Sequence, residues 1–343
     1  MSMFAETIAP EHEYRHAPDG DPSYNESTYY NFLCPESGVV GWVRVAMQPN
    51  RSAGQAGVLI FLPDGETLFT YDRTPPASPD ALAVGGLAFD IVEPHRRQRL
   101  RYDGPLASFA DPRVLGEPGR AFREAPRRDV RLRLSVTGHG DSFGANGGDP
   151  ANILEETLAL GHYEQFIHVE GDIEVDGRPL RVRGGGLRDH SWGPRDWAGP
   201  LAYRWIIASF DDGSAMMTLD VFRRDGTRTR RAAVAADGVT SPAELTDLTV
   251  EWTADGFCRR AVCAVETAGG PVTLTATARQ PERFVPLRHR RDAEDGTELV
   301  TRIGYAAYEM TTSDGRRGLG VVEVLDQLVD GLPVGMTGTL AEA

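Results

Sequence analysis

The densest group of chemically active side chains in this sequence lies in the segment 184–197, GGGLRDHSWGPRDW. Its last ten residues combine two acids, an imidazole, two guanidinium groups and two indoles: Arg188, Asp189, His190, Trp192, Arg195, Asp196 and Trp197. A tryptophan buries about 150–250 Å², so two indoles between charged groups predict a partly apolar pocket wall that carries fixed polar groups. Such a wall can bind an apolar ligand and shift the pKa of a nearby acid.

Proton transfer is the chemistry that these residue types allow. Indoles that remove water from Asp189 or Asp196 raise its pKa and make it a general acid, whereas a neighbouring arginine lowers that pKa. In an alternative interpretation, Asp–Arg ion pairs fix a long loop and the tryptophans close the end of a barrel. We take Asp189, His190 and Asp196 as catalytic candidates. The candidates for substrate binding in the same segment are Arg188, Trp192, Arg195 and Trp197.

A second candidate group lies upstream, in the expected strand 163–175. Alternation along a strand places His162, Glu164 and His168 on one face and Tyr163 on the other. Glu164 and His168 could point into a cavity as a proton relay or as metal ligands, with His190 as a third ligand. The alternative is a solvated sheet face. No compact motif such as HExxH supports a metal, so we predict none. Tyr163, Glu164 and His168 join the substrate-binding candidates.

Three further acidic residues, in two regions of the chain, allow an interpretation without catalysis. Glu26 and Thr28 fall on one strand face near the start of the chain, as lining of a barrel or, preferably, as part of an N-terminal plug. Glu309 and Glu323 flank the turn Ser313-Asp314-Gly315, where cross-strand packing at the surface is the preferred interpretation.

The composition excludes several classes of function. All 36 basic residues are arginines, which rules out Schiff-base, pyridoxal phosphate and P-loop chemistry that needs a lysine. No GxGxxG opens a helix and no GxSxG elbow is present, so neither a dinucleotide site nor a serine hydrolase is indicated. Three cysteines without a CxxC pair predict reduced thiols rather than a zinc site or a disulfide framework. We expect no cofactor.

Charge and hydropathy restrict the partners. The net charge of −14 repels phosphate backbones, so nucleic acid is not an expected partner. No apolar run approaches the roughly 20 residues that a membrane-spanning helix needs, and the N-terminus lacks a secretory signal. We therefore expect a cytoplasmic protein without a membrane span that binds a hydrophobic small molecule. The sequence gives no indication of its oligomeric state.

Short Val-, Leu-, Phe- and Tyr-rich runs separated by turns dominate the chain, and only Pro150–Leu160 shows a helical pattern. Asp-Gly turns such as Asp176-Gly177 between alternating runs predict hairpins. About fifteen antiparallel strands exceed one small barrel and must close to remove their edges. The sequence therefore predicts an all-β protein with two antiparallel β-barrels and few short helices. The expected domains are 1–182 and 183–343, with the loop 138–149 as the second choice of boundary.

Three segments together resemble the carotenoid 1,2-hydratase (hydroxyneurosporene synthase) and AttH-like superfamily of tandem lipocalin-like proteins. They are GGGLRDHSWGPRDW, HYEQFIHVEG upstream and YEMTTSDGRRGLGVVE near the C-terminus. The resemblance covers residues 20–330 in layout, its specific part is the DHSWG box, and it is closer to an uncharacterised bacterial branch than to the carotenoid enzymes. It implies two lipocalin-like barrels, an isoprenoid-like substrate, and water addition to an alkene or acid-initiated cyclisation without metal or nucleotide. The family role carries over to Asp189, with His190 and Trp192.

The resulting hypothesis is a cofactor-independent hydratase, cyclase or isomerase in which the loop 188–197 caps a cavity between the barrels. Asp189 or Asp196 protonates a terpenoid, carotenoid or steroid, the indoles stabilise the cation, and His190 accepts a proton. The second hypothesis is a lipocalin-like carrier without chemistry. A third is a metal-dependent enzyme that uses His162, His168 or His190.

Overall fold

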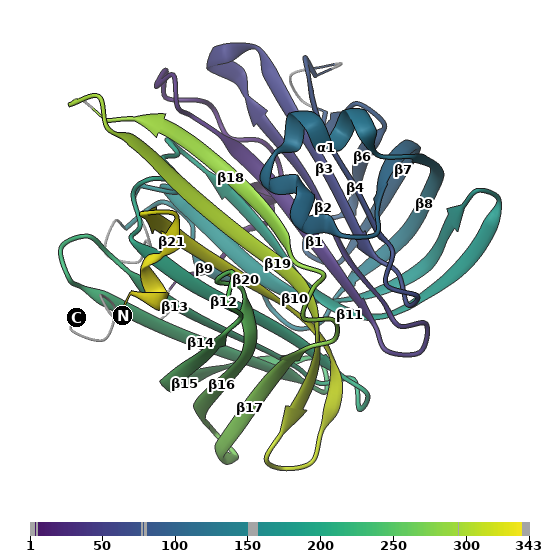
Figure 1. Cartoon of the computed structure of the whole chain (residues 1–343). Helices are drawn as coiled ribbons and strands as arrows, with labels where there is room; N and C mark the ends of the chain where they lie inside the picture. Colours follow the sequence, from purple (N-terminus) through teal and green to yellow (C-terminus); the bar gives the residue numbers. More distant parts are fainter. Residues whose placement is uncertain are drawn as a thin grey trace.

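The computed structural model consists of two closed antiparallel β-barrels packed side by side (Figure 1). It describes residue 4, residues 6–76, residue 78, residues 81–149, residues 157–293 and residues 295–337. The predicted fold class, an all-β protein of two tandem barrels, is confirmed.

The first barrel is a ring of eight strands in the order β4-β3-β2-β1-β11-β10-β8-β7, which a β4–β7 pairing closes. These strands are β1 (Glu26–Cys34), β2 (Val39–Gln48), β3 (Ala53–Phe61), β4 (Thr67–Thr74), β7 (Arg97–Phe109), β8 (Arg127–Gly138), β10 (Gly161–Val175) and β11 (Arg178–Trp192). Three short strands extend this sheet: β5 (Ala83–Val84), β6 (Leu87–Glu93) and β9 (Phe143–Ala145). Closure pairs the edges that an open sheet would leave exposed.

The second barrel repeats this arrangement in the order β19-β17-β16-β15-β14-β13-β12-β20, closed by a β19–β20 pairing. Its strands are β12 (Ala202–Phe210), β13 (Ala215–Phe222), β14 (Arg228–Ala236), β15 (Val239–Trp252), β16 (Cys258–Thr267), β17 (Gly270–Ala278), β19 (Glu298–Thr312) and β20 (Arg317–Val329). The strands β18 (Val285–Asp292) and β21 (Leu332–Pro333) extend it. In Figure 1 the β18–β19 hairpin reaches from the second barrel toward the first.

Helices are few and short. Among the described residues, the α-helix is α1 (Pro118–Glu124), and the 3₁₀ turns are η1 (Pro10–Glu13), η2 (Pro49–Arg51), η3 (Pro112–Gly116) and η5 (Val334–Met336). The sequence missed α1, because seven residues are too few to show helical periodicity. Residues 150–156 of the predicted helix Pro150–Leu160 lie outside the described residues, and no helix covers 157–160.

The 184–197 segment is not the single loop that the sequence suggested. Residues 184–192 form the second half of β11, which pairs with β1 on one side and with β10 on the other. The β10–β11 hairpin turns at Asp176-Gly177, where both residues have positive φ (47° and 78°), as the predicted two-residue turn requires. On a strand, neighbouring side chains point to opposite faces, so Asp189 and His190 cannot share one pocket.

The predicted domain boundary at 182/183 falls inside β11, which pairs throughout with strands of the first sheet. The first strand of the second barrel begins at Ala202. We therefore propose that the boundary lies in the connection 193–201, on the C-terminal side of the expected position.

Apolar side chains form three large clusters. One fills each barrel, the first around Val58, Phe89 and Leu132 and the second around Ile206, Met216 and Leu274. The third lies between the barrels and contains Tyr29 and Trp42 of the first together with Trp205 and Tyr305 of the second. The two barrels thus share a core, and the site lies within it.

Candidate functional site

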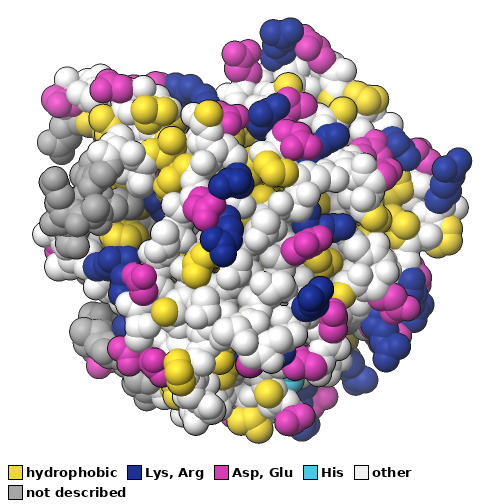
Figure 2. All heavy atoms as spheres, turned by 60° about the horizontal axis from the view of Figure 1, so that its bottom comes forward, with side chains coloured by type: hydrophobic (Ala, Val, Ile, Leu, Met, Phe, Trp, Pro, Cys, Tyr) yellow, Lys and Arg dark blue, Asp and Glu magenta, His cyan; other side chains and the backbone are white. Residues whose placement is uncertain are grey.

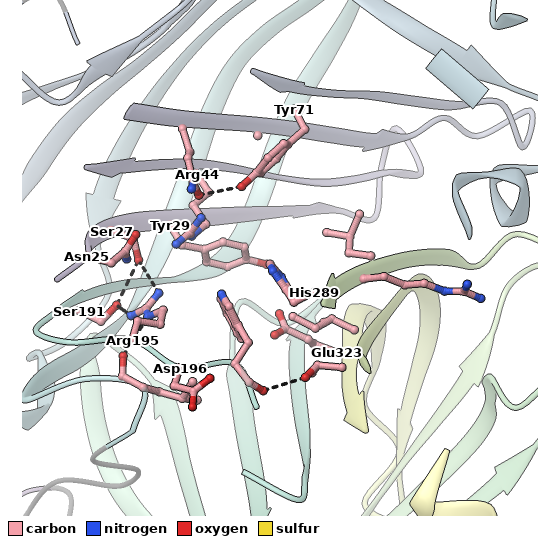
Figure 3. Close-up of a pocket in the computed structure, with 18 of the residues that line it drawn as sticks. Asn25, Ser27, Tyr29, Arg44, Tyr71, Ser191, Arg195, Asp196, His289 and Glu323 are labelled. Carbon is pink, nitrogen blue, oxygen red and sulfur yellow. Dashed lines mark hydrogen bonds between the residues drawn. The ribbon is translucent and has the colours of Figure 1, made fainter. Parts of the chain in front are cut away.

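A cavity of about 830 Å³ lies between the two barrels. Residues of β1, β2, β10 and β11 line one side, and residues of β12, β18, β19 and β20 line the other. This volume is in the range of small-molecule sites. Figure 3 shows Ser27, Ser191 and Arg195 on one side of the cavity, and His289 and Glu323 across from them.

Strand register sets the polar groups of the first barrel in one row. Arg44 of β2 lies beside Tyr29 of β1, Tyr29 beside Asp189 of β11, and Asp189 beside Glu164 of β10. Cross-strand partners point to the same face of a sheet, and this row faces the cavity.

The second barrel presents a matching row. Glu323 of β20 lies between Trp205 of β12 and Tyr305 of β19. The two rows meet through aromatic rings, because the Tyr29 and Trp205 centroids are 5.6 Å apart and those of Trp42 and Tyr305 are 5.4 Å apart. The walls are therefore aromatic, with carboxyl groups between the rings.

Asp189 is the acid whose surroundings best fit a proton donor. Burial raises its pKa to about 7, against the opposing influence of Arg195, Arg44 and Arg188. No hydrogen bond or ion pair to another described residue engages its carboxyl group, and its partly exposed surface lines the cavity. A carboxylic acid in this state can donate its proton to a ligand near neutral pH.

Two other carboxyl groups of the cavity also favour the neutral form. Burial raises the pKa of Glu323 to about 7, although the hydroxyls of Tyr203 and Tyr305 lower it. Tyr203 donates a hydrogen bond to Glu323. Burial and the nearby Asp189 raise the pKa of Glu164 well above its usual value.

Asp196, the second acid of the segment, is in different surroundings. Its carboxylate accepts hydrogen bonds from the Arg291 guanidinium and from the backbone of Ala198, and about a third of the side chain is exposed. Because the guanidinium of Arg291 and the backbone of Ala198 already engage this carboxylate, our proposal assigns no acid role to Asp196.

The remaining sequence candidates divide between the two faces of the sheet. Arg195 and Trp197 line the cavity with Asp189 and Glu164. Arg188, His190, Trp192 and Tyr163 point to the opposite face, toward the interior of the first barrel. His168 stacks on His139 outside the cavity, with ring centroids 4.2 Å apart.

The residues on the opposite face hold the N-terminal segment (residues 8–16) against the end of the first barrel. Glu13 forms a buried bidentate pair with Arg188, and the second of its two bonds measures 2.8 Å. His190 Nε2 lies 3.0 Å from Glu26, and the imidazole of His16 lies 2.8 Å from the same carboxyl. Glu26 itself belongs to barrel strand β1 and faces the same side as His190, so it lines the barrel, and residues 8–16 rather than Glu26 form the plug that the sequence favoured.

His16, Glu26 and His190 are also the one group among the described residues whose donor atoms are close enough to hold a metal ion, within 4.8 Å of one another. Their 2.8 and 3.0 Å separations are hydrogen-bond distances, and this set faces away from the cavity. The predicted alternative of Glu164, His168 and His190 is not assembled, because β-strand alternation separates Glu164 from His190.

Several cavity residues were missed by the sequence or interpreted differently. No motif marks Arg44 and Trp42 of β2 or Trp205 of β12. The two strands lie far apart in the chain. Glu323 was expected at the surface, but only 5% of it is exposed. Glu323 lies in a strand with alternating side chains, and the sequence gave no sign that the first barrel covers its face of that strand.

The fold and the cavity define a class: tandem β-barrel proteins that share the architecture of the carotenoid 1,2-hydratase and AttH-like superfamily. Within that class, the chain belongs to the DUF7064 family, described as a domain of unknown function, whose model matches residues 9–328.

Solved structures agree with this class. A protein assigned as AttH (NE1406) from Nitrosomonas europaea is 16% identical, with a TM-score of 0.57 over 93% of this chain and 97% of that one. Kievitone hydratase from Nectria haematococca is 12% identical, with a TM-score of 0.53 over 95% and 97%. CghA, in complex with Sch210972, is 13% identical, with a TM-score of 0.52 over 95% and 96%. No curated protein sequence matches the chain. The resemblance seen in the sequence is thereby confirmed at the level of fold.

Two of the sequence predictions concern nucleic acid and the membrane as partners. On the face drawn in Figure 2, charged side chains of both signs are interspersed and no basic patch stands out. Among the described residues, no helix has the length and apolar character needed to cross a membrane.

Proposed function

We propose that this protein is a cofactor-independent hydratase, cyclase or isomerase acting on a hydrophobic, isoprenoid-like substrate in the cavity between its barrels. The observation that carries the proposal is Asp189, an unpaired carboxyl with a raised pKa on an aromatic cavity wall. Kievitone hydratase, which has this fold, is a hydratase by name.

In the proposed reaction, the Asp189 carboxyl donates its proton to one carbon of an alkene, and the other carbon becomes a cation. The rings of Trp205, Trp42 and Tyr29 stabilise that cation by about 0.5–2 kcal/mol each. Water then adds to the cation, or a second double bond attacks it and closes a ring.

The final proton returns to the Asp189 carboxylate that the first step created. This differs from the sequence hypothesis, in which His190 accepted the proton. His190 points into the first barrel and is hydrogen-bonded to Glu26, so the proposal gives it a positioning role through the N-terminal segment.

Exchange with heavy water tests the proposal without a known substrate. Protein is incubated in D₂O with an apolar extract of its source organism, and products are analysed by mass spectrometry. Protonation of an alkene carbon leaves a C–D bond, so we expect at least one compound to gain deuterium with the wild type. Asp189→Asn should reduce the rate by about 10²–10⁴-fold, whereas the matched variant Asp196→Asn should retain it.

Full activity of Asp189→Asn contradicts the assignment of the acid. A ligand that co-purifies and is released unchanged, with no deuterium gained by any compound, favours the second candidate function, a carrier. That candidate is supported by the aromatic cavity itself, which binding alone also requires.

A further inference from the structure

Arginines outnumber acids in the cavity between the barrels. Seven arginines and four acids line it. At the rim, Arg291 pairs with Asp196 and Arg290 with Glu298, so these two cations are compensated. Arg44 and Arg195 form no ion pair with any other described residue.

Arg44 is half-buried on β2 and forms no ion pair or hydrogen bond with any other residue that the structure describes. Buried guanidinium groups are normally paired, because removal from water costs several kcal/mol per ion. Its neighbour in the register, Tyr29, also has a buried hydroxyl without a hydrogen-bond partner among the described residues.

Within the described part of the chain, all the hydrogen-bond partners of Arg195 are neutral groups. It donates to the Leu158 carbonyl at 2.8 Å and to the hydroxyls of Ser27 and Ser191 at 3.2 and 2.6 Å (Figure 3). These bonds use three of its five N–H groups. Burial and the positive charge of Arg44 lower the pKa of Arg195 to about 10. The two guanidinium groups therefore repel each other.

The acids nearby offset this charge only in part at neutral pH. Burial raises the pKa of Asp189 and of Glu323 to about 7, and it raises the pKa of Glu164 well above its usual value. His289 responds to the same field, because burial together with Arg44, Arg73 and Arg195 lowers its pKa to about 4. The interior of the cavity is therefore positively charged while it contains no ligand.

A positive cavity is a poor place to form a carbocation unless something neutralises it. We propose that the substrate is an amphipathic anion, whose isoprenoid-like body lies along the aromatic wall and whose carboxylate or phosphate group lies between Arg44 and Arg195. The inference rests on the proposed function, since it names the chemical class of substrate for that same site. The anion gives both guanidiniums a counterion and offsets their charge in the cavity where the cation forms.

Binding of three farnesyl compounds tests the proposal. Farnesol, farnesoic acid and farnesyl phosphate share one apolar body and differ only in the head group, and quenching of tryptophan fluorescence reports binding beside Trp42 and Trp205. We expect at least one anion to bind the wild type about tenfold or more tighter than farnesol, a difference of roughly 1.4 kcal/mol. The tighter anion identifies the head group as carboxylate or phosphate.

Arg44→Gln should remove most of this preference and leave the affinity for farnesol within about twofold. Arg44→Lys, which keeps the charge, should retain part of it, and circular dichroism checks that both variants fold. Arg181→Gln is the control, since Arg181 does not line the cavity and pairs with Glu170 and Asp172, and it should keep the preference.

Three results overturn the inference: farnesol binds as tightly as both anions, Arg44→Gln weakens all three ligands equally, or none of the three binds. Because the measurement needs no turnover, its outcome is independent of the heavy-water experiment. Head-group selectivity can fail while Asp189 still proves to be the acid, and the reverse also holds.

Discussion

At the scale of single residues, the alternation of a β-strand decides which side chains can act together. Asp189 and His190 are adjacent in the sequence, yet one faces the cavity between the barrels and the other faces the N-terminal segment. The sequence identified the segment as chemically important. The sequence could not assign the side chains of this segment to the two faces of a strand, because it suggested a loop where β11 continues.

The raised pKa of Asp189 lowers the stability of the folded state. The folded state holds this carboxyl neutral up to about pH 7, whereas the unfolded chain ionises it near pH 4. Above pH 7 the unfolded state is therefore favoured by the full effect, and the effect disappears as the pH falls toward 4.

We expect Asp189→Asn, which mimics the neutral acid, to be more stable than the wild type by about 1–2 kcal/mol at pH 8, allowing for the partial exposure of the side chain to cavity water. The gain should vanish near pH 4. Urea denaturation at both pH values measures it, and an equal difference at pH 4 and pH 8 would show that ionisation is not the cause.

At the scale of elements, the N-terminal segment closes the first barrel through a buried ion pair. Glu13 and Arg188 are each at most 2% exposed, and Arg188 also donates to Gln165 at 2.9 Å. The sequence placed Arg188 in the substrate site. Nothing in the composition of residues 8–16 shows that Glu13 reaches β11, since the two residues are 175 positions apart.

Removing one residue of the Glu13–Arg188 pair should therefore strongly destabilise the folded protein. We expect Glu13→Ala to lower the free energy of unfolding by about 3–5 kcal/mol, because it leaves the Arg188 charge buried without a counterion. Asp196→Ala, which breaks the exposed pair with Arg291, should cost less than about 1 kcal/mol. Comparable losses in urea denaturation of the two variants would contradict this account.

At the scale of the whole molecule, the hairpin pattern was enough to predict two barrels but not how they meet. Asp-Gly turns such as Asp176-Gly177 fix local pairing, and antiparallel strands in this number must close. The shared core depends on which outward faces are apolar. Tyr29, Trp42, Trp205 and Tyr305 come from four strands, and their meeting follows from register and packing rather than from any local motif.

The domain boundary that we propose, within 193–201, can be tested by splitting the chain. Co-expressed fragments divided after Gly199 should reassemble into a folded protein, because the break leaves every barrel strand whole. Fragments divided after Val182 should not, because that break cuts β11 in the middle of its pairing with β10. Co-purification of the fragments and circular dichroism measure the reassembly. Equal reassembly of both pairs of fragments would argue against the proposed boundary.

The central claim is that the two barrels together keep one carboxyl, that of Asp189, protonated near neutral pH. Titration of protein labelled with ¹³C at the aspartate carboxyl carbons, with Asp189→Asn to assign the signal, measures this directly. We predict that the Asp189 resonance titrates with a pKa of about 7. A midpoint below about pH 5 would show that the arginines hold it ionised, and Asp189 could then not be the acid.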